Sequence, residues 1–112
     1  MKQVSVFVND EKVFDYDKET TFEENQLKYL DTMDGDMHKG IKIQGELITE
    51  PDSRQRATFI VMNLIKALRQ DNQAVLSVSC AYLNNRIPDL SEVHVNDIKA
   101  GIHIEYIGEN DR

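Results

Sequence analysis

The chain has 112 residues, of which 40% are hydrophobic and 29% charged, a composition that predicts one ordinary globular domain rather than a disordered chain. Its formal net charge of −7 argues against nucleic acid and anionic membranes as partners, because both require clustered lysine and arginine. The acidic excess lies in the first half of the chain. Residues 1–53 include six lysines and thirteen acidic residues, whereas residues 54–112 include seven basic and seven acidic residues.

Residues 3–16 have the pattern of a β-hairpin. Val4, Val6 and Val8 recur at every second position in a run rich in β-forming side chains. Asn9 and Asp10 are turn residues, and a second short run of strand type follows them. This pair lacks the glycine of the most favoured two-residue turns, so the sequence leaves the turn type open.

A helix is predicted from about residue 20 to about Lys39. Thr20 with Glu23, or Thr21 with Glu24, gives a capping-box pattern at its start. Its apolar residues recur at helical spacing and form one stripe: Phe22, Leu27, Leu30, Met33 and Met37.

The end of this helix and the segment after it are less well defined. Gly35 weakens the helix by roughly 1 kcal/mol relative to alanine, which predicts a kink or an early end. Gly40 is a natural stop. Residues 41–49 hold four aliphatic side chains around Gly45, and we predict a packed loop there, with a short strand as the alternative.

The strongest helix signal lies at residues 53–70. Asp52 and Gln55 form a capping-box pattern, and the acidic charge of Asp52 suits the positive end of a helix. Phe59 and Met62 project on the side opposite the apolar face. That face is formed by residues at i, i+3, i+4 spacing: Ala57, Ile60, Val61, Leu64, Ile65 and Leu68.

Residues 73–86 fit two patterns. Alternation at Leu76, Val78, Cys80 and Tyr82 is typical of a strand, whereas the spacing of Leu76, Cys80, Leu83 and Ile87 is typical of a helix. We predict a helix, with Asp71 as its cap and Pro88 beyond its end.

A second hairpin is predicted over residues 91–107, with a four-residue loop from Asp97 to Ala100. That loop length places His94 opposite His103 and Glu92 opposite Glu105. The whole chain, residues 1–112, is thus predicted to be a single α+β domain: a small antiparallel sheet of two hairpins packed against three helices. A ferredoxin-like sandwich is the alternative if residues 73–83 form a strand.

Two pairs of side chains are candidate metal ligands. Asp34 and His38 have the i, i+4 spacing that can place two ligands on one divalent cation, although the same residues also fit a solvated helix face. His94 and His103, flanked by two glutamates, could bind Zn²⁺ on an outer sheet face. Such a face can equally be hydrated or form a subunit interface.

The location follows by elimination. Cys80 is the single cysteine, so no internal disulfide can form and the chain fits a reducing compartment. The N-terminal residues have no apolar segment of signal-peptide length, and the longest apolar run, residues 59–62, is too short to span a bilayer. We therefore expect a cytoplasmic protein.

No catalytic set or cofactor motif can be assembled from the sequence, so we expect a non-enzymatic interaction or regulatory protein without a cofactor. Because a large apolar pair is seldom left open on a monomer, we expect a homodimer with Phe59 and Met62 at its interface, and a protein partner as a further option. The alternative function is a metal- or small-ligand-binding protein, or a hydrolase, that uses Asp34 with His38 or His94 with His103.

Overall fold

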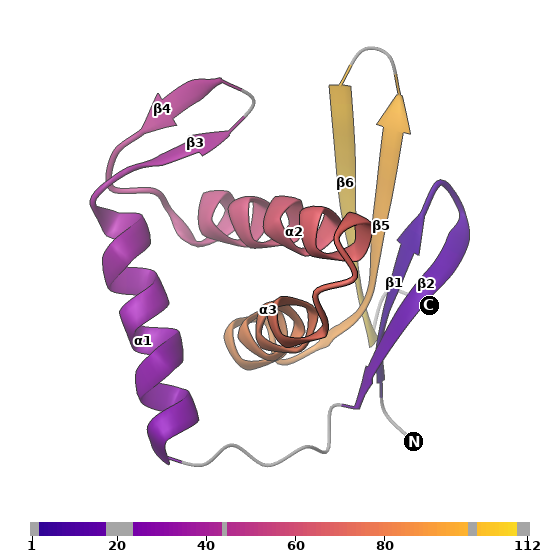
Figure 1. Cartoon of the computed structure of the whole chain (residues 1–112), viewed down its shortest axis with the longest axis horizontal. Coiled ribbons are helices and arrows are strands. Elements are labelled where there is room, and N and C mark those ends of the chain that lie inside the picture. The colour runs from indigo at the N-terminus through magenta and orange to yellow at the C-terminus, as the bar shows by residue number, and fades with distance from the viewer. Residues whose placement is uncertain (1–2, 18–23, 44, 99–100, 110–112) are drawn as a thin grey trace. The chain divides into compact units, whose positions relative to one another are not determined.

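The computed structural model describes residues 3–17, 24–43, 45–98 and 101–109 (Figure 1). Its α+β class is the one predicted. The chain divides into two compact units: a sheet unit, residues 1–20 with 80–112, and a helical unit, residues 21–79. The elements in chain order are β1 (Gln3–Val8), β2 (Glu11–Asp17), α1 (Glu24–His38), β3 (Ile41–Ile43), β4 (Glu46–Ile48), α2 (Ser53–Arg69), α3 (Gln73–Arg86), β5 (Leu90–Ile98) and β6 (Gly101–Gly108).

The predicted N-terminal hairpin is confirmed as β1 and β2. Asn9 and Asp10 have φ angles of 51° and 68°, and two successive positive values define a type I′ turn. Val6 pairs with Phe14 and Phe7 with Lys12, so Val13 is an extra residue and forms a β-bulge. Since β2 is an edge strand, the bulge and its charged side chains make it a poor template for another strand.

The four-stranded sheet is mixed, with the strand order β2-β1-β5-β6. Each hairpin is antiparallel, as expected, but β1 pairs with β5 in parallel. Local turns dictate the antiparallel pairs, whereas the β1–β5 pair joins segments far apart in the sequence. Most of one face of these central strands is buried, since Val4, Val6, Val93 and Val95 are at most 1% exposed and Val8 at the end of β1 is half-buried.

The C-terminal hairpin exists, but its predicted register is wrong by two residues. His94 pairs with Glu105, and His103 pairs with Asn96. The strands continue further toward the turn than expected, because Ile98 still pairs with Gly101 and only two residues connect them. A shift of two keeps every side chain on its predicted face but changes each partner.

In the helical unit, α1 is one continuous helix through Gly35 to His38, so the predicted interruption is absent. The capping boxes predicted at Thr20 and Thr21 fall outside the described residues. The predicted loop over residues 41–49 is instead the hairpin β3–β4, which lies between α1 and α2 in the chain (Figure 1). Gly45 provides its turn with a φ of +84°, and Ile41 is buried at its base.

Helix α2 begins where the sequence predicts. The Asp52 side chain accepts from the Gln55 backbone N–H at 2.8 Å, and the Gln55 side chain accepts from the Asp52 N–H at 2.9 Å. Five of the six residues predicted on its apolar face are buried, and Leu68 is half-buried. The buried residues of α2 are Ala57, Ile60, Val61, Leu64, Ile65 and Ala67.

Residues 73–86 are helical, as predicted, which removes the strand that the ferredoxin-like alternative requires. The predicted cap, Asp71, is not the residue that caps α3. Asp71 has a φ of 53° and ends α2, while the side chain of Asn72 accepts from the Val75 N–H at 3.2 Å. No helix in the described part of the chain combines the length and apolar character needed to cross a membrane.

The two glycines at the end of α1 should respond to alanine in opposite directions. A Cβ atom at Gly35 meets no atom within 4 Å, so Gly35→Ala should raise the free energy of unfolding by about 0.5–1 kcal/mol. Gly40 has a φ of +133°, where an L-residue is strained, so Gly40→Ala should lower the free energy of unfolding by about 1 kcal/mol or more. Urea unfolding followed by circular dichroism measures both. Destabilisation by Gly35→Ala would contradict a continuous α1.

Candidate functional site

The structure does not direct Asp34 and His38 toward a common point. Asp34 Oδ1 lies 3.5 Å from Arg56 Nε, which is an ion pair between α1 and α2. His38 Nε2 lies 3.9 Å from a carboxylate oxygen of Glu50, and both of these side chains are mostly exposed. Within the described ranges no three His, Cys, Asp or Glu side chains are grouped closely enough to hold a metal ion.

Arg56 is the partner of Asp34, a pairing that the sequence does not predict. Its guanidinium also donates to the Pro51 carbonyl at 3.4 Å and to the Ser53 hydroxyl at 3.3 Å. These contacts hold the start of α2 and, through Asp34, connect it to α1. Helical spacing within α1 alone gives no sign of this partner, because Arg56 is 22 residues away in sequence.

His94 is the most highly organised of the histidines. Its ring stacks on the Phe7 ring with centroids 4.4 Å apart and an interplanar angle of 3°. Its Nε2 lies 2.7 Å from a carboxylate oxygen of Glu92. This stacking depends on the parallel pairing of β1 with β5, which places Phe7 beside His94. His103 is exposed and pairs with Asn96, so the predicted pair of facing histidines does not form.

The polar face around His94 continues onto the edge strand. The Ser5 hydroxyl donates to Asp15 at 2.6 Å, and Lys12 Nζ lies 3.3 Å from the same carboxylate. The hydrogen bond from Ser5, supported by Lys12, lowers the pKa of Asp15 below its ordinary value. Asp15 is thus held by Ser5 on the neighbouring strand and by Lys12 on its own strand, which fits an ordered polar surface.

Cys80 is buried in α3 and has no exposed surface. Burial raises the pKa of its thiol to about 12, because the thiolate loses its hydration in an apolar environment. The thiol is therefore protonated at neutral pH, which is the opposite of what a nucleophilic cysteine requires.

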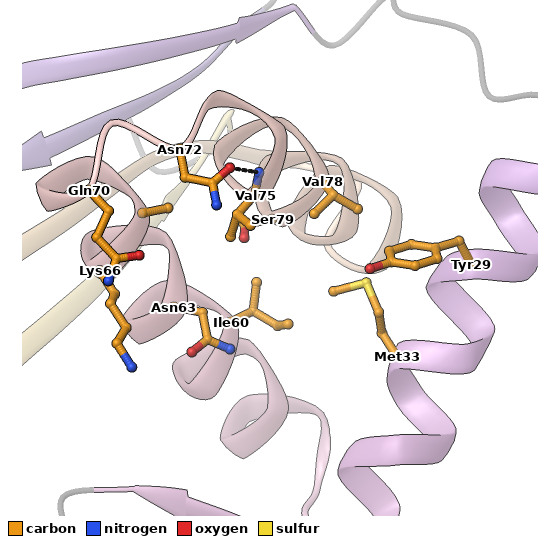
Figure 2. Close-up of a pocket in the computed structure, with 11 residues that line it drawn as sticks. Tyr29, Met33, Ile60, Asn63, Lys66, Gln70, Asn72, Val75, Val78 and Ser79 are labelled. Atoms are coloured by element: carbon orange, nitrogen blue, oxygen red, sulfur yellow. Dashed lines mark hydrogen bonds between the residues drawn. The ribbon is translucent and has the colours of Figure 1, made fainter.

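A pocket of about 410 Å³ lies within the helical unit (Figure 2). Side chains of α1, α2 and the first turns of α3 surround it. Its polar residues gather on one side, while Met33 and the Tyr29 ring extend from α1 on the other. The lining residues are Tyr29, Met33, Ile60, Asn63, Lys66, Ala67, Gln70, Asn72, Val75, Val78 and Ser79.

None of the four predicted metal ligands lines this pocket. The predicted interface pair adjoins it, however. Phe59 precedes Asn63 by four residues, Met62 precedes Lys66 by four, and residues at that spacing are neighbours on a helix surface. The helical pattern of the sequence predicts which residues of α2 lie next to Phe59 and Met62. The contributions of α1 and α3 to the pocket depend on tertiary packing.

Cys80 should resist thiol reagents in the folded protein. With a pKa of about 12 instead of 9.0, the thiolate fraction at pH 8 falls roughly 1,000-fold, and burial further blocks access. Mixing with an aromatic disulfide reagent, with and without denaturant, measures the labelling rate. Rapid labelling of the folded chain would show that α3 exposes this thiol.

Zinc should not accompany the purified protein in stoichiometric amounts, because Asp34, His38 and His94 each face a different partner. Elemental analysis of the untagged protein measures this directly. One equivalent of zinc that disappears in His38→Ala or His94→Ala would overturn the expectation.

No family model, curated protein or solved structure matches this chain. Its function therefore has to be argued from its own geometry and charge.

Proposed function

We propose that this is a non-enzymatic interaction protein that acts as a homodimer, with Phe59 and Met62 of α2 at the contact. The observation that carries the proposal is the contrast between two sides of α2. Five of the six residues on its apolar face are at most 6% exposed, while Phe59 and Met62 on the other side are half-buried. An apolar pair that keeps part of its surface open on a helix flank is suited to a subunit contact.

The pattern of residues around this pair supports a helix–helix contact. Residues 55, 59, 62, 66 and 69 lie on α2 at alternating steps of four and three, which is the seam spacing of packed helices, and the N-cap residue Asp52 precedes them. We call these six residues the α2 seam. Its centre is apolar, with Phe59 and Met62, and its two ends are polar, with Asp52 at the beginning and Arg69 at the end.

This seam is complementary to a second copy of itself in an antiparallel arrangement. A two-fold axis midway between Phe59 and Met62 places Phe59 against the partner subunit's Met62. The same axis brings Asp52 opposite the partner subunit's Arg69, so that opposite charges meet at both ends. A parallel arrangement would instead place like charges together, and an antiparallel dimer is therefore the better fit.

The chemistry of the remaining side chains supports a non-enzymatic role. Asp34 and His94 are each engaged by an intramolecular partner, and Cys80 is buried and protonated. A catalytic set needs a nucleophile or base that converges with other groups on a substrate position. The described residues therefore favour binding over catalysis.

Light scattering after size exclusion tests the dimer. Wild-type protein should have the mass of two chains, and the Phe59→Glu, Met62→Glu double variant should have the mass of one, because two carboxylates cannot be buried there without partners. Leu47→Glu is the matched control: Leu47 is 63% exposed on β4, outside the seam, and its variant should remain dimeric.

Two outcomes contradict the proposal. A monomeric wild type removes the dimer altogether. A double variant that loses its helical circular dichroism instead places Phe59 and Met62 in the intramolecular core.

A further inference from the structure

We propose that the pocket between α1, α2 and α3 binds a small amphipathic monocarboxylate, with the carboxylate at Lys66 and the apolar body against α1. The inference goes beyond the proposed dimer and does not rest on it, since every lining residue belongs to one helical unit. The pocket volume of about 410 Å³ lies within the roughly 300–1,000 Å³ typical of small-molecule sites.

Charge is the first argument. The chain carries twenty acidic and thirteen basic residues, yet no acid lines the pocket and one lysine does. In so acidic a protein, a cavity that excludes carboxylates and presents an ammonium group is selective for an anion. Lys66 has no ion pair with any residue in the described part of the chain, so its charge is available to a ligand.

The donors around Lys66 define the kind of anion. Asn63 and Gln70 contribute side-chain amides, and Asn72 contributes a further amide whose oxygen already accepts from the Val75 N–H. Figure 2 shows these three amides on the same side of the pocket as Lys66. One ammonium and several neutral amide donors match a carboxylate, which has one negative charge and about four acceptor positions. A phosphate dianion would be left with uncompensated charge.

The opposite side of the pocket defines the rest of the ligand. Met33 and Val78 are apolar and half-buried, and the Tyr29 ring stands beside them (Figure 2). Ile60 lies between the two sides and is 2% exposed. Burial of an aliphatic or aromatic body here is favourable, because it removes apolar surface from water. A wholly polar anion would lose water against these side chains without compensation.

The probe is sodium octanoate, titrated into ¹⁵N-labelled full-length protein. Backbone amide shifts should move at residues 29, 33, 63, 66 and 78 with one-site saturation. Octanol, which keeps the chain and lacks the charge, should bind at least about tenfold more weakly, because a charge-assisted hydrogen bond contributes roughly 1.5–3 kcal/mol, equal to tenfold or more in Kd. Octyl phosphate should bind no more tightly than octanoate.

Variants assign the carboxylate to its position. Lys66→Gln should weaken octanoate binding by about tenfold or more and leave octanol unchanged. Lys42→Gln is the matched control, since Lys42 is an exposed lysine of the same unit that does not line the pocket, and it should bind octanoate as the wild type does. Both positions are exposed, so both variants should fold.

Three results would overturn the inference. The first is the absence of shift changes in the pocket at millimolar octanoate. The second is equal loss of affinity in the Lys66 and Lys42 variants, which would indicate a general charge effect. The third is tighter binding of octyl phosphate or octanol than of octanoate. Light scattering of the same wild-type sample reports the dimer independently, so the two proposals can fail separately.

Discussion

The parallel pairing of β1 with β5 is the constraint on which the sheet unit depends. It joins two locally formed hairpins from opposite ends of the chain into one sheet, and it aligns Val4 and Val6 with Val93 and Val95 on one buried face. The turn residue Asn9 strengthens the connection, because its N–H donates to the Val95 carbonyl at 2.8 Å and its side chain accepts from the Asp97 N–H at 2.9 Å. A non-glycine turn residue thus forms the turn and also holds β5.

The same pairing explains why His94 is held in place. Parallel register places Phe7 beside it, and the stacked ring together with Glu92 fixes the imidazole in one orientation. Asp34 is held in a comparable way by Arg56 across two helices. Asp34 contacts a second helix and His94 a second strand, so each has a partner that its own element does not supply. Sequence spacing alone therefore does not show whether a polar side chain is available to a metal or a ligand, because its tertiary partners decide this.

The proposed dimer contact and the proposed ligand pocket use adjoining strips of the surface of α2. Phe59 and Met62 form the centre of the α2 seam, and one turn further along the helix Asn63 and Lys66 face the pocket. Lys66 belongs to both strips. An anion bound at Lys66 would change the charge at the edge of the seam, so the geometry allows a ligand to influence assembly. Both proposed surfaces are binding surfaces.

Features that arise from residues close together in the chain were predictable from the sequence alone. The Asp52–Gln55 capping box and the apolar period of α2 were both readable, because a helix satisfies its own hydrogen bonds. Residues 73–86 fit both a helix and a strand pattern, and the predicted helix is the one that forms. The β1–β5 pairing, the partner of Arg56 and the pocket are visible only in the folded chain. These depend on contacts between segments far apart in the chain, and a two-residue shift between β5 and β6 leaves the alternation pattern unchanged.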